Sequence, residues 1–355
     1  MSAHPPTDQD SRNEPTKVMT ETANNTQRKR IYWLDNVKWF LILLVVLGHA
    51  IQHTYTDFDQ KWLFRAIYSF HMPAFMAVSG YLAYRAQAAK PHVRTYGKRL
   101  LRRIRQLVIP YIIWSLTAVL VINGRVTGTD LTTLVTDPEQ HLWFLWVLFW
   151  IFAFFETVRL ISARWPKHET GIVLGSLVML YMLVSLCHTQ RFGLGSMKYY
   201  YIYYCLGYFA HRYPKAFTLP RPAFFALFIL WGFATHYWQM VPVATWVPDL
   251  HIASAKLMYK LFNLAVATSA ILVLLNVFSR YADKQYATTH LGQVTLGIYA
   301  IHQAVITLSA QSLSRLTPWL LVTINFTVGL LASLLIIFIL RKSRIGRYIL
   351  LGENL

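Results

Sequence analysis

Ten apolar segments, each about as long as a lipid bilayer is thick, divide this chain and limit the folds that are open to it. They lie at residues 33–52, 66–84, 107–122, 143–160, 171–188, 196–210, 223–240, 259–278, 291–310 and 318–340. A helix that crosses the hydrocarbon core needs roughly 17–25 predominantly apolar residues. The sequence therefore predicts an all-α polytopic membrane protein with about ten transmembrane helices.

The composition excludes the other broad classes of protein. Only 14% of the residues are charged and 55% are hydrophobic, whereas a soluble domain carries roughly 25% charged residues. This excludes an ordinary soluble enzyme, and it excludes disorder over most of the length. The two cysteines, Cys187 and Cys205, both lie within apolar segments. We expect them to pack rather than to form a metal site, and we expect no metal cofactor.

The distribution of Lys and Arg predicts the orientation in the membrane. With the N-terminus inside, 25 of them fall on the cytoplasmic side and eight on the opposite side, while Lys38 lies within the first segment. This asymmetry favours an N-in and C-in topology. Residues 1–30 are then a disordered cytoplasmic tail, residues 31–341 a transmembrane domain and residues 342–355 a cytoplasmic C-terminal tail. Because the net charge of +19 sits between apolar segments, we expect contacts with membrane lipids and no nucleic acid partner.

The first apolar segment carries ionisable side chains, which are costly in a membrane and are therefore candidates for function. Lys38 and His49 are 11 residues apart, so on a helix they share one face and lie roughly 16 Å apart along the axis. Asp35 lies close to the same line. One alternative is an Asp35–Lys38 ion pair that anchors the helix end. Another is that His49 only forms a hydrogen bond to a neighbouring helix.

Two further histidines lie inside apolar segments. His71 is in the outer half of the membrane at a depth similar to that of His49, which indicates either a shared polar cavity or two separate structural residues. His302 lies mid-membrane, and the spacing of seven from Thr295 and to Ser309 puts these three residues on one helix face. Such a face must contact protein or water, and structural hydrogen bonding is the alternative to a functional role.

The fourth apolar segment has polar residues at both of its ends. His141 and Trp143 lie at the outer interface, where Trp is typical of an anchoring belt and His141 could line an entrance. Near the inner end we expect Glu156 to pair with Arg159, three residues later. The tyrosines at residues 199–204 favour packing and anchoring over chemistry.

A strongly basic stretch follows the second apolar segment. Residues 85–105 hold eight Lys and Arg and no acid. Contact with lipid headgroups explains much of this charge. A docking surface for a polyphosphorylated cofactor is an equally weighted and compatible interpretation. The residues that cluster on a helix before Pro110 are Lys98, Arg99, Arg102, Arg103 and Arg105.

In this order, the polar landmarks resemble those of the membrane acyltransferase family 3, and most closely its fucose 4-O-acetylase-like branch. They cover residues 31–341 and comprise Lys38 to His49, Phe70 to Tyr81, Lys98 to Tyr111, His141 to Leu145 and Leu296 to His302. One departure is Lys38, because the family often has arginine there. Lysine keeps the charge but loses the bidentate geometry of a guanidinium.

The resemblance implies an enzyme of the bacterial plasma (inner) membrane. Such proteins move an acyl group, often acetyl, from cytoplasmic acyl-CoA to a hydroxyl of an extracytoplasmic glycan or lipid-linked sugar. We expect acetyl here, with succinyl as the alternative. The basic stretch lies on the cytoplasmic side, where acyl-CoA would bind, and the histidines lie in the outer half, where the sugar would enter. A non-catalytic polysaccharide exporter or transporter, or a lipid- or pH-sensing membrane protein, would share the same composition and topology.

The mechanism expected from this resemblance assigns a role to each polar landmark. His49 is the general base that deprotonates the attacking hydroxyl, since an imidazole titrates near neutrality. Lys38 holds the CoA side or polarises the thioester carbonyl. Phosphate binding falls to Arg99, Arg102, Arg103 and Arg105. The acceptor-side or supporting residues are Asp35, His71, Ser79, His141, Trp143 and His302.

Overall fold

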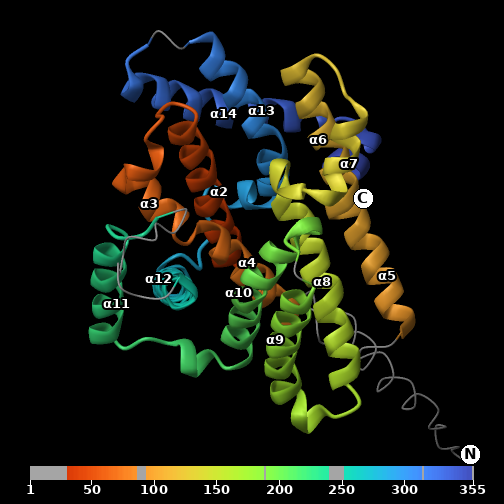
Figure 1. Ribbon diagram of the computed structural model, residues 1–355, viewed down its shortest axis with the longest axis vertical. Helices are drawn as coiled ribbons and strands as arrows, with labels where there is room; N and C mark the ends of the chain where they lie inside the picture. The colour runs from red at the N-terminus through yellow and green to blue at the C-terminus, as the bar shows by residue number, and fades with distance from the viewer. Residues whose placement is uncertain (1–29, 86–92, 188, 240–251, 314–315, 354–355) are drawn as a thin grey trace, which may run out of the picture.

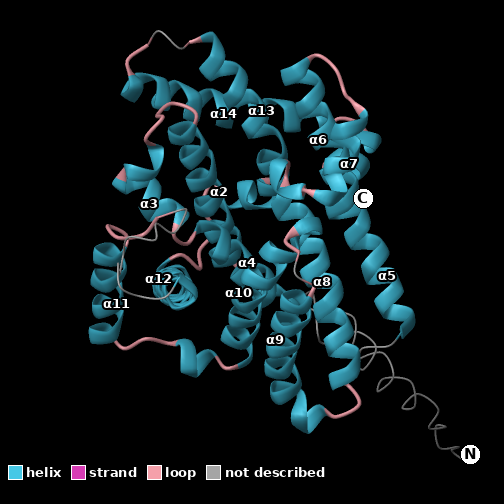
Figure 2. Ribbon diagram, viewed as in Figure 1, coloured by secondary structure: helices cyan, strands magenta, loops and turns pink. Residues whose placement is uncertain are grey.

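Helices make up all of the regular structure in the described part of the chain. The structure, a computed structural model, describes residues 30–85, 93–187, 189–239, 252–313 and 316–353, and no strand occurs within these ranges (Figure 2). The α-helices are α2 (Tyr32–Gln52), α3 (Trp62–Tyr68), α4 (His71–Arg85), α5 (Val93–Arg103), α6 (Ile109–Asn123), α7 (Gly128–Thr136), α8 (Trp143–Ser162), α9 (Glu169–Leu186), α10 (Leu194–Arg212), α11 (Arg221–Ala234), α12 (Ile252–Tyr281), α13 (Thr295–Ser312) and α14 (Pro318–Leu340). Short helical turns lie between them at η1 (Phe58–Gln60), η3 (Ile104–Val108), η4 (Pro138–Gln140), η5 (Pro166–His168), η6 (Arg191–Gly193), η7 (Pro214–Phe217), η9 (Thr289–Gln293) and η10 (Gly346–Leu350).

Each of the ten predicted apolar segments overlaps a helix, and the all-α class is confirmed for the described residues. Six helical stretches are long and apolar enough to cross a membrane: Tyr32–Gln52, Thr95–Asn123, Trp143–Ser162, Pro166–Leu186, Leu257–Tyr281 and Pro318–Leu340. The remaining four segments, 66–84, 196–210, 223–240 and 291–310, form helices that are shorter or less apolar. The number of ten spans and the N-in, C-in orientation therefore stay predictions.

Helix α2 is the central element, and the close pair α4 and α10 packs beside it. Figure 1 shows α2 between the α13–α14 pair and α12, and it contacts α3, α4 and η9 as well. The α4–α10 contact brings backbone against backbone at Gly80 and Gly207. A Cβ atom at Gly80 would lie 1.8 Å from the carbonyl oxygen of Tyr204, and one at Gly207 would lie 1.7 Å from that of Ala77. Only glycine permits this approach, as is common where membrane helices pack.

Large apolar side chains cover the outward faces of several helices. A monomeric soluble protein rarely exposes apolar surface over such areas. Lipid tails would cover these faces in a bilayer, which agrees with the apolar segments of the sequence. Examples on α9, α11 and α14 are Val178, Leu186, Ile229, Phe233, Leu335 and Phe338.

The C-terminal segment packs against the end of the bundle that carries the basic helix, residues 93–108, which we call the basic end. The indole Nε1 of Trp114 donates a hydrogen bond to the carbonyl oxygen of Leu350 at 2.8 Å. Glu353 forms an ion pair with Arg341 at 2.6 Å, and its carbonyl oxygen accepts a hydrogen bond from Arg105. The predicted C-terminal tail is therefore packed against the protein as far as residue 353. The predicted N-terminal tail, up to residue 29, lies outside the described residues.

Candidate active site

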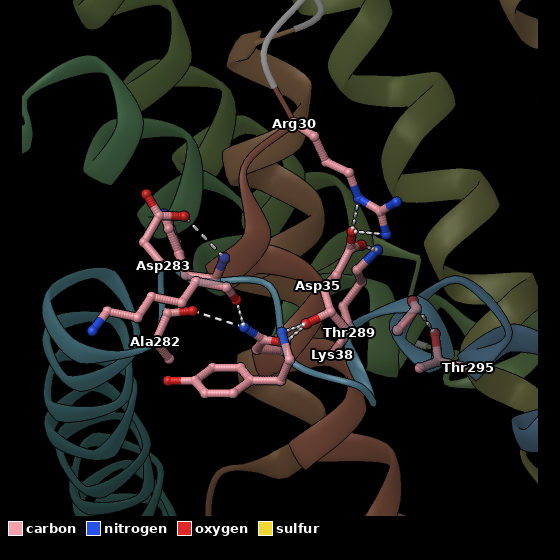
Figure 3. A network of polar contacts seen from close by, with 12 residues as sticks. Arg30, Asp35, Lys38, Ala282, Asp283, Thr289 and Thr295 are labelled. Carbon is pink, nitrogen blue, oxygen red and sulfur yellow. Dashed lines mark hydrogen bonds and ion pairs between the residues drawn. The ribbon is translucent and has the colours of Figure 1, made fainter.

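A polar network fixes the first turn of α2 (Figure 3). The Asp35 carboxylate forms ion pairs with Arg30 and Lys38, both at 2.7 Å. The ion pair between Asp35 and Lys38 is the anchoring contact that the sequence offered as an alternative role for these residues. This ion pair engages the ammonium group of Lys38, while 23% of the Lys38 side chain stays exposed.

The same network ties α2 to the end of α12 and to η9. The Asn36 side-chain amide donates hydrogen bonds to the carbonyl oxygens of Ala282 and Lys284, at 2.7 and 3.0 Å. The Thr289 hydroxyl donates to the Asn36 side-chain oxygen at 2.7 Å. Gly292 packs so closely on Asp35 that a Cβ atom there would lie 2.2 Å from the Asp35 carbonyl oxygen. These contacts hold α2 in position and in register.

The other half of α2 opens onto a cavity of about 570 Å³. Since α2 is one continuous helix from Tyr32 to Gln52, His49 lies roughly 16 Å along the axis from Lys38. The cavity is lined from α2, α3, α4, α8, α10, α12 and α13, together with the residues between η4 and α8. Four of the predicted site residues line it: His49, His71, His141 and Trp143.

The histidines around this cavity differ in how their ring nitrogens are used. His71 Nδ1 lies 2.9 Å from the carbonyl oxygen of Ile67, so it carries the proton and donates. The Tyr68 ring packs between His49 and His71, at centroid distances of 6.3 and 4.7 Å. Its hydroxyl donates to the side-chain oxygen of Gln52 at 3.0 Å. The structure therefore places His49 and His71 in one cavity, which was one of the two arrangements predicted for them.

His302 lies directly behind His49 rather than on the cavity wall. Its side chain is fully buried, and the two imidazole centroids are 5.1 Å apart. Thr295, on the same face of α13, is also buried. The polar face predicted on this helix therefore faces protein.

The outer rim of the cavity is formed by the segment before α8. The Nε2 atom of His141 lies 3.1 Å from the hydroxyl of Thr133. Burial lowers the pKa of the His141 imidazole, although the carboxylates of Asp130 and Asp137 oppose this shift. Beside it Glu139 accepts a hydrogen bond from the hydroxyl of Ser196. The rim thus presents a neutral imidazole and one carboxylate.

Aromatic rings form one wall of the cavity. Trp143 and Tyr200 lie with centroids 5.0 Å apart and an angle of 30° between the ring planes. Tyr199 and Tyr299 line the cavity as well, although no pattern in the sequence distinguishes them from their neighbours. Gln52 and Gln303 were also missed, and a simple signal existed for both. Gln52 follows His49 by three residues and Gln303 follows His302 directly, so each lies near a chosen histidine.

Like His302, two further predicted supporting residues lie away from the cavity wall. The Ser79 hydroxyl donates to the carbonyl oxygen of Phe75 at 2.9 Å, on the helix that packs against α10. This is a bond within one helix, as expected of a packing serine. Asp35 belongs to the network at the start of α2.

The basic stretch forms a helix whose Arg99 and Arg103 contact the middle and the C-terminal half of α8. Glu156 binds Arg159 at 2.8 Å, as the sequence predicts, and Arg99 also reaches it at 3.1 Å. Glu156 and Arg159 are almost completely buried, at 4% and 1% exposure of their side chains. This cluster joins α5 to α8 and carries more positive than negative charge.

The other three predicted phosphate-binding arginines differ in exposure. Arg102 is exposed to solvent. Arg103 donates to the side-chain oxygen of Gln106 at 3.2 Å, while its Nε atom is buried without a partner among the described residues. Arg105 donates to the carbonyl oxygen of Glu353 at 2.6 Å. A cofactor phosphate therefore has Arg102 freely available, whereas the other arginines also hold the helices together.

Comparison with known proteins assigns the chain to a family. The profile of the acyltransferase domain, acyltransferase 3, matches residues 31–342. Nodulation protein NolL of Sinorhizobium fredii is 31% identical over 301 residues, which are 78% of this chain and 78% of that protein. Nodulation protein NolL of Mesorhizobium japonicum is 29% identical over 298 residues, which are 76% of this chain and 75% of that protein. No solved structure matches the chain.

These matches confirm the enzyme predicted from the sequence. The assignment to the fucose 4-O-acetylase-like branch stays a prediction, because the matches establish the wider family. The family profile covers most of the chain, and six helices are long and apolar enough to span a bilayer. The protein is therefore a multi-pass membrane acyltransferase that belongs to the acyltransferase 3 family.

Proposed function

We propose that this protein transfers an acetyl group from acyl-CoA, bound at its basic end, to a hydroxyl of a sugar held in the cavity. The observation that carries the proposal is a single cavity lined by His49, His71 and the aromatic rings of Trp143 and Tyr200. In a member of an acyltransferase family, such a cavity is the default place for the reaction. The acceptor is a glycan or a lipid-linked sugar.

In this mechanism His49 is the general base. An uncharged imidazole nitrogen takes the proton of the sugar hydroxyl as the oxygen attacks the thioester carbonyl carbon. The C–S bond then breaks, and the CoA sulfur leaves with the proton returned by His49. The products are the sugar ester and CoA-SH, and no charge is left on the protein. A general base positioned in this way contributes roughly 10²–10⁴-fold to the rate.

Lys38 belongs to the cofactor side of the proposed site. Because it lies roughly 16 Å along α2 from His49, it cannot contact a thioester that is within reach of the His49 imidazole. Its ion pair with Asp35 leaves part of the side chain exposed at the basic end. Lys38 therefore contacts the CoA portion of the donor, and the polarisation of the carbonyl falls to groups of the cavity.

The phosphates of CoA bind to the basic helix formed by α5 and η3. Arg102 is exposed there, and the buried Nε atom of Arg103 has a hydrogen to donate. Guanidinium groups suit phosphate oxygens because of their charge and planar geometry. Arg99 and Arg105 add positive electrostatic potential around this surface. Arg99 also pairs with Glu156 of α8, and Arg105 also bonds to Glu353 of the C-terminal segment.

The acceptor sugar packs against Trp143 and Tyr200. The C–H faces of a sugar ring are apolar and fit an aromatic surface, while its hydroxyls need polar partners at the edge. Those partners are His141, Gln303 and Glu139, all of which line the same cavity. This combination of an apolar wall and a few polar groups is typical of a site for a small neutral ligand.

The charges around the cavity favour acetyl over succinyl. None of the described residues that line it is Lys or Arg, and Glu139 is its one carboxylate. A succinyl group would carry a carboxylate into this space without a cation to pair with it, which is unfavourable. Both relatives are bacterial, which supports the bacterial plasma membrane as the location, with the basic end in the cytoplasm where acyl-CoA is found.

The test is acyl transfer by the purified protein in lipid vesicles. Radiolabelled acetyl-CoA is added on the side that exposes the basic helix, with wild type and His49→Ala in parallel. We expect loss of label from CoA with wild type only, and none of that loss with succinyl-CoA. If neither protein consumes any acyl-CoA when glycan acceptors are present, the proposal is wrong. Movement of an unmodified glycan in the same vesicles would then support an exporter.

A further inference from the structure

Two neighbouring imidazole rings, one on α2 and one on α13, each carry a buried nitrogen without a partner among the described residues. His49 Nδ1 and His302 Nε2 are both inaccessible to solvent, and neither has a hydrogen-bond partner among the described residues. The rings that carry them have centroids 5.1 Å apart and planes tilted by 56°. A buried nitrogen that can form a hydrogen bond but lacks a partner is unfavourable, so each of these atoms calls for an explanation.

The protonation of His302 follows from its own helix. His302 Nδ1 lies 2.9 Å from the carbonyl oxygen of Ile298, and a carbonyl can only accept. The proton of a neutral His302 is therefore on Nδ1. Its Nε2 atom carries a lone pair and can only accept a hydrogen bond.

Three other polar groups near His49 have hydrogen-bond partners. The Tyr68 hydroxyl donates to Gln52, and His71 Nδ1 donates to the carbonyl oxygen of Ile67. The Tyr299 hydroxyl accepts from the backbone N–H of Phe144 at 3.4 Å. His302 Nε2 is a buried acceptor on the ring beside His49, and no described residue donates to it.

We propose that His302 is a positioning residue whose Nε2 atom accepts the Nδ1–H of His49 and so leaves the Nε2 lone pair of His49 directed to the cavity. The inference rests on the proposed function, because it explains how His49 is held as a base. The separation is suitable, since two ring radii and one hydrogen bond of roughly 3 Å add to about the observed distance between centroids. The structure records no hydrogen bond between the two nitrogens, so the proposed bond requires a rotation of the side chains.

The pair also accounts for what happens during transfer. When His49 Nε2 takes the proton of the sugar hydroxyl, the ring becomes an imidazolium with hydrogens on both nitrogens. The His302 lone pair then accepts from a charged donor, and such bonds are stronger than neutral ones. A carboxylate commonly fills this place in catalytic triads, and there too it fixes the tautomer of the base. Here a second imidazole does so without bringing a charge into the membrane.

Two substitutions of His302 separate positioning from packing. His302→Gln keeps an acceptor near the Nε2 position, whereas His302→Leu keeps volume and removes the acceptor. We expect kcat for acetyl transfer to fall about 10²–10³-fold in His302→Leu and less than about tenfold in His302→Gln. KM values for acetyl-CoA and for the sugar should stay within about twofold, because neither ligand contacts His302. Ser309→Ala, on the same face of α13, is the matched control and should keep the wild-type kcat.

A second readout does not depend on activity. In protein labelled with 15N-histidine, His49 should carry its proton on Nδ1 in wild type and His302→Gln, and should show mixed tautomers in His302→Leu. The His49→Ala spectrum identifies its signals. Wild-type kcat in His302→Leu, or proton placement on His49 that is unchanged by it, would overturn the inference. The proposed function fails separately, if His49→Ala transfers acetyl as well as wild type does.

Discussion

The basic end and the cavity end of this molecule use their polar groups in opposite ways. At the basic end, charged side chains pair with one another: Asp35 with Arg30 and Lys38, Glu156 with Arg99 and Arg159, Glu169 with Arg212, and Glu353 with Arg341 and Arg347. Around the cavity the polar groups are imidazoles, hydroxyls, amides and the single carboxylate of Glu139, and Lys and Arg are absent from its described lining. The same α2 helix connects the two ends.

The charged residues of the basic end connect helices to one another, whereas the polar residues of the cavity are available to bind a ligand. A buried ion pair is destabilising to break, because the remaining partner is left as an uncompensated charge. The imidazole nitrogens of His49 and His302 have no such partner, so removing either ring breaks no charge pair. Substitutions at the basic end should therefore act on stability, and substitutions at the cavity should act on turnover or on acceptor binding.

The largest effect should come from removing the base while keeping a polar side chain. We expect His49→Gln to lower kcat at least about 10³-fold, which corresponds to roughly 4 kcal/mol in the activation free energy. Its thermal unfolding midpoint in detergent should match that of wild type, because no ion pair is lost. Turnover and the unfolding midpoint are measured on the same preparation. If the unfolding midpoint of His49→Gln fell so far that unfolding explained the lost turnover, the distinction between the two ends would be wrong.

The opposite outcome is expected at Glu156. Glu156→Gln leaves Arg159 and Arg99 without their carboxylate, in a place where the Arg159 side chain is only 1% exposed. Breaking a buried pair in this way should reduce the free energy of unfolding by about 3 kcal/mol. The kcat of the folded fraction should be that of wild type, since the pair lies at the far end of α8 from Trp143. A variant that is as stable as wild type but inactive would assign Glu156 to the chemistry instead.

Much of the fold and part of the site could be predicted because they depend on the number of residues that separate two positions within one helix. The rise along a helix fixes the depth of each residue, and this was enough to predict a similar depth for His49 and His71, which line one cavity. The Glu156–Arg159 pair was likewise predicted from a separation of three residues. These predictions needed no knowledge of which helices are neighbours.

The remaining features depend on how the helices rotate and pair. Tyr199 and Tyr200 were taken for packing residues, and whether a tyrosine of α10 faces the cavity is decided by the fit of α10 to α4 at Gly80 and Gly207. The contact of Arg99 with Glu156 joins residues 57 positions apart, which no local pattern indicates. The same holds for His302, which was predicted to lie mid-membrane and whose contact with the His49 ring no local pattern indicates.

A smaller effect is expected at the aromatic wall, where it should appear in binding rather than in turnover. Trp143→Ala removes the indole that faces Tyr200 at 5.0 Å. We expect KM for the sugar acceptor to rise about tenfold, which is roughly 1.4 kcal/mol, while KM for acetyl-CoA stays unchanged. Trp143→Phe keeps an aromatic face and should recover most of the loss. An equal rise in both KM values would mean that the indole supports the fold of the cavity rather than the acceptor.

The smallest effect should come from an ion pair that has the same chemistry as Glu156–Arg159 but lies in solvent. Lys61 binds Asp57 at 2.9 Å, and both side chains are at least 40% exposed. The hydrogen bond from Lys61 lowers the pKa of the Asp57 carboxyl from its ordinary value of 3.8. Any contribution to stability is therefore complete at neutral pH and is lost only as the pH falls below that value.

Water screens this pair, so Asp57→Asn should leave both the unfolding midpoint and kcat unchanged at pH 7. Measured beside Glu156→Gln, it tests whether burial, rather than the presence of an ion pair, gives the basic end its structural role. Equal loss of stability in the two variants would show that burial is not the cause. The distinction between the two ends would then rest on the cavity alone.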